Sequence, residues 1–338
     1  MRHVTIILAG LGRVGRAFAG LLEEKGEAVR SRYGLDLELH SVICRDGGLH
    51  AAKRHGLHGV EKLAAAAVRS HPQWNAGLTL PEALSILDPG VLVECTPTDL
   101  ETGEPGLGYM RAALGAGWSI AAASKGALVL RYRELFELAS AGRLQIRYSG
   151  ATAAALPTLD TGVYALAGAE ISGIDGILTG TTNHILGRME EGLDFQEALQ
   201  EAQEKGIAEP DPSLDIDGWD TLCKILLVAN AAAGTSFELD DIPRSGIREV
   251  TRASLAAART EGRSLKLLGR FVRESGGPRA SVGVRPLEPS HPLYHVNGTN
   301  KGIVFFTDTM GIVAVTGGKS DPRGTAAALL KDIINIHR

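Results

Sequence analysis

The sequence has 338 residues, of which 44% are hydrophobic and 22% are charged, as is ordinary for a globular protein with room for two domains. The formal net charge of −4 argues against a strong field for nucleic acid or a membrane surface. No apolar stretch reaches the roughly 18 residues of a membrane helix, and the apolar N-terminal run is interpreted as a strand rather than a leader. We therefore expect a cytoplasmic protein.

Three cysteines, Cys44, Cys95 and Cys223, stand far apart in apolar surroundings. An odd number without a Cys-x-x-Cys pair argues against a disulfide framework and against structural zinc. We interpret them as reduced and mostly buried thiols, which agrees with a cytoplasmic location.

The first part of the chain alternates strand and helix patterns. Val4–Ala9 is a continuous apolar run, as in a strand buried on both faces of a parallel sheet. Val14–Lys25 has apolar residues at helical spacing. Further strands are predicted at Leu37–Ile43, Val91–Glu94 and 118–124, and further helices at 61–70 and 131–142. This alternation predicts an α/β fold with a Rossmann-type, doubly wound parallel sheet.

After about residue 140 the patterns are those of an α+β domain. β-like runs are predicted in 171–182 and 265–315, and helices in 194–205, 217–233 and Thr325–Ile336. The stretch 275–294 is rich in Gly, Pro and Ser, which is typical of edge strands and loops, so we expect an open mixed sheet. The chain is expected to divide into one domain of residues 1–140 and 320–338, and a second of residues 141–319.

A glycine-rich loop stands directly between the first strand and the first helix. In a Gly-x-Gly-x-x-Gly pattern the first glycine allows the tight turn, the second lets the backbone approach a pyrophosphate, and the third lets helix and strand pack closely. A glycine turn without a ligand is the alternative, but the strand–turn–helix setting favours a dinucleotide. The predicted cofactor contacts in the loop are Gly10, Leu11, Gly12, Arg13, Val14 and Gly15.

The choice of dinucleotide depends on the end of the second strand, where an acid would bind the ribose of NAD. Asp36 has nearly the usual spacing from the loop but lies at the wrong end of that strand. Arg45 lies at the correct end and could pair with the 2′-phosphate of NADP, whereas Asp46 could serve a ribose hydroxyl. We favour NADP(H) over NAD(H), the alternative being that Arg45 is an exposed arginine without a ligand.

Two further patterns imitate ligand sites. TGGKSD, at 316–321, lacks the first glycine of a phosphate loop, because Val313 stands there. His50, His55 and His58 are close in sequence, yet their spacing puts only some on one helical face and no acid triad accompanies them. We expect neither a phosphate loop nor a metal site at these positions.

Five carboxylates precede a single lysine in AEPDPSLDIDGWDTLCKI, residues 208–225. The stretch imitates a calcium loop, but Lys224 stands where a bidentate Glu is required. On a helix that begins near Gly218, Asp220 and Lys224 are neighbours one turn apart. The pair is either an exposed ion pair worth about a few tenths of a kcal/mol, or part of a site in which acids hold an ammonium group and the lysine transfers a proton.

The segment GTTNHILGRMEEGLDFQEALQEAQEKGIAEPDPSLDIDGWDTLCKI strongly resembles the substrate-binding signature of homoserine dehydrogenases. GLGRVGRAFAGLLEEK, ECTPTDLETGEP and AAASKGAL are similar to other parts of that family, so the resemblance covers nearly the whole chain. It implies reversible hydride transfer between L-aspartate 4-semialdehyde and L-homoserine, a step of threonine and methionine biosynthesis, with the hydride chemistry supplied by NAD(P). It also implies a short form without a kinase or a C-terminal regulatory domain.

The resemblance implies roles for individual residues. Lys125 and Lys224 correspond to the family's pair of catalytic lysines, and Asp220 corresponds to the acid that orients Lys224 and the substrate. Glu209 and Asp215 correspond to carboxylates that hold the α-ammonium group. The same pocket is lined by Gly180, Thr181 and Thr182. Further cofactor contacts are implied at Thr96, Pro97, Ser124, Gly317 and Thr325.

The chain departs from the family pattern at three places, the mildest of which is Ser124, where Ala-Ser-Lys replaces the commoner Ala-Asn-Lys. Ser149 stands where members often carry Glu, at a position associated with a monovalent cation. Na⁺ or K⁺ would then rest on backbone carbonyls near Ala151 and Ala153. In the C-terminal GGKSDPRGTA, Lys319 and Asp321 replace glycines, so the cofactor contact there is expected to differ.

Two alternatives remain open. One is a paralogous NAD(P)-dependent oxidoreductase that acts on another small amino-acid-like alcohol or aldehyde. The other is a non-catalytic, nucleotide-sensing protein, which would have no need of Lys125, Asp220 and Lys224. The expected partners are the small-molecule substrate and a second copy of the chain, because an open sheet has edges that need covering. No nucleic acid or membrane partner is expected.

Overall fold

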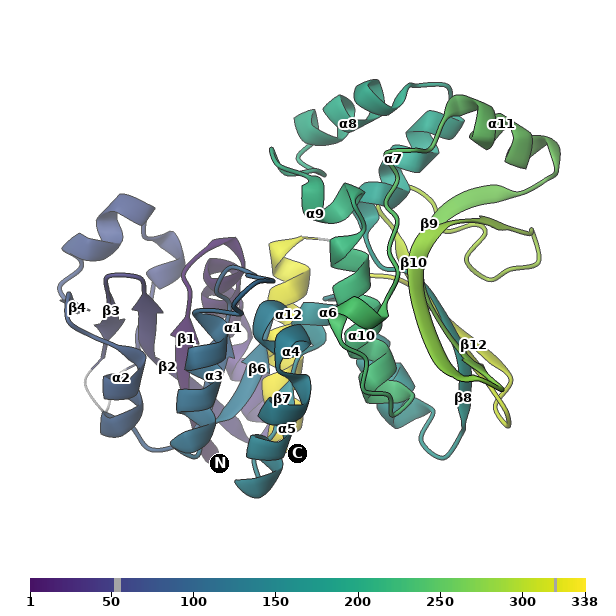
Figure 1. The fold of residues 1–338 in the computed structure, drawn as a ribbon. Helices are drawn as coiled ribbons and strands as arrows, with labels where there is room; N and C mark the ends of the chain where they lie inside the picture. The colour runs from purple at the N-terminus through teal and green to yellow at the C-terminus, as the bar shows by residue number, and fades with distance from the viewer. Residues whose placement is uncertain (52–55, 319–320) are drawn as a thin grey trace. The chain divides into compact units, whose positions relative to one another are not determined.

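The computed structural model describes residues 1–51, 56–318 and 321–338. The chain forms two compact units (Figure 1), one of Met1–Ala155 with Asp321–Arg338 and one of Leu156–Ser320. The first unit extends beyond the expected boundary at residue 140, because the short helix α6 (Ser149–Thr152) packs against the C-terminal helix α12 (Pro322–Ile336). Each unit has its own sheet and its own apolar core.

A seven-stranded sheet with the order β4-β3-β2-β1-β5-β6-β7 forms the centre of the first unit. Its strands are β1 (Arg2–Ala9), β2 (Leu35–Cys44), β3 (Gly47–His50), β4 (Trp74–Asn75), β5 (Val91–Glu94), β6 (Ser119–Ala122) and β7 (Ile146–Arg147). The strands from β2 through β1 to β7 are parallel, whereas β3 and β4 are antiparallel. The order reverses at β1 as in doubly wound folds, which confirms the predicted Rossmann-type sheet.

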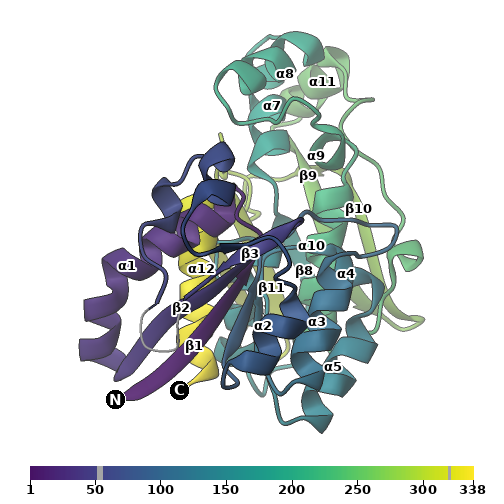
Figure 2. The ribbon, with the colours of Figure 1, turned by 90° about the vertical axis from the view of Figure 1, so that its left-hand side faces the viewer.

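Besides α6 and α12, the helices of this unit are α1 (Arg13–Tyr33), α2 (Leu80–Ile86), α3 (Gly106–Gly115), α4 (Gly126–Leu130) and α5 (Tyr132–Ala141). Helices cover both faces of the sheet, with α1 and α12 on one side and α2, α3 and α5 on the other (Figure 2). Helix α1 runs past its predicted end to Tyr33 and stops at Gly34, which is left-handed. The helix predicted at 61–70 is instead two 3₁₀ segments, η1 (Val60–Lys62) and η2 (Ala65–Ser70).

The apolar run of β1 is explained by its place in the middle of this sheet. Val4–Ala9 is buried throughout, because helices pack on both faces of the strand. Helix α12 joins the same core through Leu329 and Ile333, which are fully buried. The C-terminal helix therefore belongs to the first unit.

A five-stranded sheet with the order β10-β9-β8-β11-β12 forms the second unit. Its strands are β8 (Ile171–Ile177), β9 (Ser264–Glu274), β10 (Gly277–Leu287), β11 (Lys301–Thr307) and β12 (Ile312–Gly317). Every neighbouring pair is antiparallel, so the expectation of a mixed sheet is wrong. Tight hairpins join β9 to β10 and β11 to β12, and such hairpins permit only antiparallel pairing.

The helices of the second unit are α7 (Gly180–Glu190), α8 (Phe195–Glu204), α9 (Ser213–Ile216), α10 (Trp219–Ala232) and α11 (Arg252–Thr260). Helix α10 contacts β8, β9 and β10, and α7 contacts β9. The β-like run predicted to reach residue 182 ends at Ile177, and residues from Gly180 on are helical. None of the helices that the structure describes is both long and apolar enough to cross a membrane.

Candidate functional site

The glycine loop joins the carboxyl end of β1 to the amino end of α1. Gly10 has a φ of 95°, and a β-carbon there would lie 2.5 Å from the carbonyl oxygen of Cys95. A β-carbon on Gly15 would lie 2.1 Å from the carbonyl oxygen of Gly10. A β-carbon on Gly12 would meet no atom of the described residues within 4 Å. The fold itself therefore requires Gly10 and Gly15, while the open space at Gly12 suits the approach of a pyrophosphate.

Two arginines lie at the carboxyl end of β2. Arg45 follows this strand directly and is exposed. Asp46, the alternative ribose ligand, pairs with Arg69 of η2. Sequence reasoning did not single out Arg69, since nothing in its local pattern relates it to β2. Asp36 lies near the start of β2, as expected, and pairs with Arg30 at 3.0 Å.

The carboxyl ends of β5 and β6 are linked through Glu94, which is fully buried. Its carboxylate accepts hydrogen bonds from the backbone N–H of Thr96 at 2.8 Å and from the hydroxyls of Thr96 and Ser124. Burial raises the pKa of Glu94. Sequence reasoning selected Thr96, Pro97 and Ser124 but missed Glu94, although an acid at the end of an apolar strand is a usable signal.

Lys125 stands between this cluster and helix α4. Its backbone N–H donates a hydrogen bond to Oγ1 of Thr98 at 3.2 Å. Because Ser124 is tied to Glu94, the backbone that carries Lys125 is held on both sides. Lys125 belongs to the first unit, and Lys224 to the second.

The second unit forms the predicted pair on α10. Nζ of Lys224 lies 2.5 Å from Oδ2 of Asp220 and donates a hydrogen bond to the carbonyl oxygen of Leu178 at 2.8 Å. Oγ1 of Thr179 donates to the same Asp220 oxygen at 2.9 Å. Both side chains of the pair are only 14% exposed. Of the two interpretations of the sequence, an exposed ion pair therefore describes Asp220 and Lys224 less well than a sheltered site.

The segment between β8 and α7 places further polar groups next to the Lys224–Asp220 pair. Thr179 precedes α7, and Gly180, Thr181 and Thr182 form its first turn. The hydroxyl of Thr181 donates to the carbonyl of Ile207, and that of Thr182 to the carbonyl of Thr179. No described side chain caps this turn, which leaves backbone N–H groups at the positive end of the helix dipole. Thr179, one residue before the recognised motif, was missed.

The remaining acids of residues 208–225 divide into two kinds. Asp217 pairs with Arg248, whose guanidinium lowers the pKa of the carboxyl. Hydrogen bonds from the turn that follows Asp211 lower the pKa of that carboxyl. Asp211 and Asp217 are thus engaged in local contacts. Glu209 is exposed and Asp215 lies on α9, which packs against α7 and α10.

Ser149 is bound by the C-terminal helix. Its N–H and its hydroxyl each donate to the Asp332 carboxylate at 2.8 Å, and Lys331 Nζ lies 2.7 Å from the same hydroxyl. Asp332 is buried, and burial raises its pKa. Ala151 and Ala153 are buried in the same segment. Where family members often carry Glu, a carboxylate therefore lies beside Ser149, but it is that of Asp332 on α12.

The C-terminal loop explains one departure from the family pattern. Gly317 ends β12 with a φ of 113°, while Lys319 lies outside the described residues. Oδ1 of Asp321 accepts a hydrogen bond from the N–H of Gly324 at 2.6 Å, so Asp321 is the N-cap of α12. Thr325 lies in the first turn of that helix.

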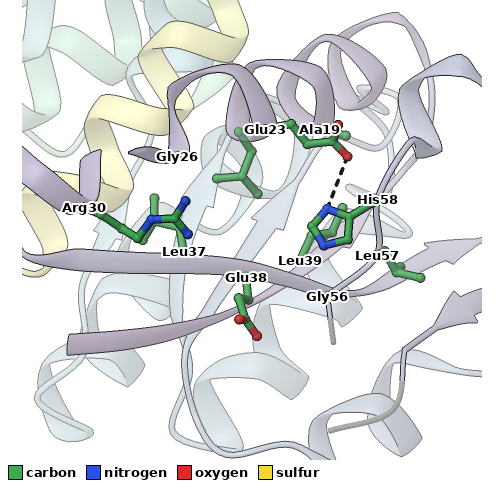
Figure 3. Close-up of a pocket in the computed structure, with 11 residues that line it drawn as sticks. Ala19, Glu23, Gly26, Arg30, Leu37, Glu38, Leu39, Gly56, Leu57 and His58 are labelled. Carbon is green, nitrogen blue, oxygen red and sulfur yellow. Dashed lines mark ion pairs between the residues drawn. The ribbon is translucent and has the colours of Figure 1, made fainter. Parts of the chain in front are cut away.

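Two of the three histidines that imitate a metal site, His50 and His58, lie in the described residues and contact different partners. His50 makes a 2.8 Å hydrogen bond with the hydroxyl of Ser41, and His58 lies 3.6 Å from Glu23. His55 lies outside the described residues. His58 and Glu23 line a pocket of about 290 Å³ between α1 and β2 (Figure 3). None of the predicted catalytic, substrate or cofactor residues lines that pocket.

Comparison with known proteins covers nearly the whole chain. The family model described as homoserine dehydrogenase matches residues 157–334, and the model described as homoserine dehydrogenase, NAD binding domain, matches residues 10–149. A homoserine dehydrogenase from Methanocaldococcus jannaschii is 34% identical, over 98% of each chain.

Two further similarities concern proteins with different dinucleotides. An NAD(+)-dependent homoserine dehydrogenase from Pseudomonas canavaninivorans is 33% identical, over 100% of this chain and 97% of the relative. A solved structure of a hyperthermophilic archaeal homoserine dehydrogenase in complex with NADPH has a TM-score of 0.85 and 26% identity, over 99% of this chain and 98% of the other.

Proposed function

Because the chain belongs to the homoserine dehydrogenase family, we propose that Lys224, Asp220 and Lys125 carry its reaction and that NADP(H) is its preferred cofactor. The protein is an NAD(P)-dependent oxidoreductase that acts on a CH–OH group. It interconverts L-aspartate 4-semialdehyde and L-homoserine. The observation that supports our assignment most is the sheltered Lys224–Asp220 pair with Thr179 and the Leu178 carbonyl around it.

In this proposal Lys224 and Lys125 transfer the proton of the reaction. NADP(H), when bound, supplies or accepts the hydride. The aldehyde oxygen gains negative charge as it is reduced and needs a proton, which Lys224 donates; in the oxidation direction Lys224 accepts it. Asp220 orients the ammonium group, and Thr179 orients Asp220. Lys125 is the second lysine assigned to the reacting oxygen.

The substrate's other groups need charged or polar partners. In our proposal Glu209 and Asp215 hold the α-ammonium group, and the first turn of α7 binds the α-carboxylate. The backbone N–H groups of Gly180, Thr181 and Thr182 suit an anion, since they lie at the positive end of a helix. This leaves the carbonyl carbon free to meet the hydride.

The first unit holds the cofactor in this proposal. The pyrophosphate lies on the loop Gly10–Gly15, and Thr96, Pro97 and Ser124 contact the nicotinamide end. Arg45 binds the 2′-phosphate, and Arg69, which holds the competing Asp46, adds a second cation at that corner. A monovalent cation at the carbonyls of Ala151 and Ala153, a homodimer and a cytoplasmic location remain predictions.

A direct assay tests this function. Nicotinamide absorbance is followed with L-homoserine and either NADP⁺ or NAD⁺, in sodium and in potassium buffers. We expect turnover with homoserine and a lower KM for NADP⁺ than for NAD⁺. A lower KM for NAD⁺ would contradict the cofactor preference alone. Absence of turnover with both cofactors in both buffers would contradict the assigned reaction.

A further inference from the structure

The amino-terminal half of the first sheet carries a cluster that the proposed reaction does not use. His3 lies on β1, and Glu38 and His40 lie on the neighbouring strand β2. Nε2 of His40 lies 3.1 Å from Oε2 of Glu38, and Nε2 of His3 lies 3.7 Å from the same oxygen. One ligand atom from each side chain can lie within 4.8 Å of both others.

These distances suit a metal ion. Two ligands about 2.0–2.1 Å from a tetrahedral zinc ion lie roughly 3.3 Å apart, and the distances 3.1 and 3.7 Å bracket that value. Two imidazoles and one carboxylate form a donor set that zinc and similar divalent ions prefer. We propose that His3, Glu38 and His40 bind one such divalent ion, with water as the fourth ligand.

The backbone presents His40 to this cluster. Ile6 of β1 pairs with Leu39 and Ile7 pairs with Ser41, so His40 is the extra residue of a β-bulge. Bulges redirect a side chain within a sheet. The His40 side chain is 3% exposed, and its Nε2 is the ring nitrogen directed at Glu38. Its Nδ1 has no hydrogen-bond partner among the described residues.

Burial lowers the pKa of His40, against the opposing effect of nearby Glu38. His3 is half exposed, so an ion can reach the cluster from solvent.

A second carboxylate, that of Asp36, lies near the other ring nitrogen of His3. Nδ1 of His3 lies 3.8 Å from Oδ2 of Asp36, and Arg30 contacts Oδ1 of Asp36 at 3.0 Å. Metal-binding histidines usually have a carboxylate or carbonyl on the ring nitrogen that does not bind the ion. Glu38, like its neighbours Leu37 and Leu39, lines the pocket beside α1. Figure 3 shows its carboxylate directed away from that helix.

The cluster is remote from the cofactor loop. His3 and Gly10 lie at opposite ends of β1, roughly 20 Å apart at about 3.3 Å per residue. The ion therefore stabilises the β1–β2 pair and takes no part in hydride transfer. This separates the proposal from the proposed reaction.

Zinc titration of the full-length, tag-free, metal-stripped protein tests the site. We expect one Zn²⁺ per chain by calorimetry, a raised thermal midpoint with Zn²⁺, and visible absorption bands of a bound Co²⁺. His3→Ala and Glu38→Gln are each expected to weaken binding at least about tenfold, since loss of even an outer-shell partner of a metal ligand costs about 10- to 100-fold. The matched control is His58→Ala, because His58 is also exposed beside a carboxylate, Glu23, but belongs to no three-ligand group in the described chain.

The outcomes are distinct. Weakened binding in His3→Ala and Glu38→Gln with unchanged binding in His58→Ala supports the site. Wild-type protein that binds no Zn²⁺ at micromolar concentration overturns it, as does equal binding by wild type and His3→Ala. Turnover of homoserine and the metal-free thermal midpoint are expected to be nearly unchanged in His3→Ala, which shows that the variant is folded and keeps this test independent of the catalytic assignment.

Discussion

At the scale of single residues, the contacts of Lys224 fix the position of its ammonium group. Its ammonium is held by the Asp220 carboxylate and by the Leu178 carbonyl, and Thr179 donates a hydrogen bond to the same Asp220 oxygen. Because the pair is mostly removed from solvent, the attraction between its two charges is screened less than that of a surface pair. The proton-bearing group is therefore fixed in position before a substrate arrives.

Replacing Lys224 tests this directly. Lys224→Ala is expected to lower kcat by about 10²- to 10⁴-fold, because general acid–base catalysis contributes that much, with an unchanged circular dichroism spectrum. Lys125→Ala should behave alike. Lys205→Ala is the matched control, since Lys205 has an acid partner, Glu201, at the same spacing but is half exposed directly after α8. A Lys224→Ala rate within a few-fold of wild type would remove Lys224 from the mechanism.

Arg45 governs the choice of cofactor in our proposal. Arg45→Ala should raise the Kd for NADP⁺ about tenfold or more, since a charged hydrogen bond is worth roughly 1.5–3 kcal/mol, and should change the Kd for NAD⁺ little. Fluorescence titration measures both constants. Arg133→Ala, at an exposed arginine on α5, is the control. Equal weakening of both cofactors by Arg45→Ala would argue against a 2′-phosphate contact.

At the scale of elements, the glycine loop offers two substitutions with different expected results. Gly12→Ala adds a methyl group where the described residues leave open space, so the thermal midpoint should hold while cofactor affinity falls at least tenfold. Gly15→Ala places the methyl group 2.1 Å from the Gly10 carbonyl oxygen and should lower the midpoint as well. Thermal unfolding and cofactor titration distinguish them. Unchanged cofactor binding by Gly12→Ala would contradict the pyrophosphate assignment.

The link between α7 and α8 predicts a pH-dependent contribution to stability. Hydrogen bonds from Lys205 and Arg188 lower the pKa of Glu201 from 4.5 to about 2. A carboxyl whose pKa is lower in the folded state stabilises the fold above its unfolded pKa, and the contribution is lost as the pH falls from 4.5 toward 2. Glu201→Gln should therefore lower the thermal midpoint at pH 7, and the difference should shrink at pH 3.

Thermal scans across this range check the expectation. Glu204→Gln is the control, because Glu204 lies on the same helix and its carboxylate accepts a hydrogen bond from the neutral Gln200 side chain. A midpoint difference for Glu201→Gln that stays constant from pH 7 to pH 3 would show that its ionisation does not stabilise the helix pair.

At the scale of the whole molecule, the second sheet leaves two edges, β10 and β12. Ile312 on β12 is 61% exposed, and exposed apolar edge strands are usually covered by another chain. We predict a homodimer, so light scattering should give twice the mass of the chain. Ile312→Lys should shift this mass toward that of the monomer if β12 is covered. A monomeric wild type at micromolar concentration would contradict the prediction.

Local patterns were sufficient for several elements. The strand Val91–Glu94 was predicted with its observed bounds, and the start of α10 after Gly218 was also predicted. These segments carry strong local signals, namely a short apolar run and a helix entrance with acids. The predictions for 61–70 and for the end of the first helix were wrong, because alanine-rich and charged stretches satisfy more than one local conformation and tertiary contacts decide between them.

The sequence by itself determined the alternation of strands and helices in the first unit, the glycine loop, and the one-turn spacing of Asp220 and Lys224. Spacing along a single element settles such features. Only the tertiary structure decided which groups meet from distant segments: Ser124 with Glu94, Thr179 with Asp220, Asp332 with Ser149, and His3 with Glu38. Strand order and register set these pairs, and neither can be deduced from one strand alone.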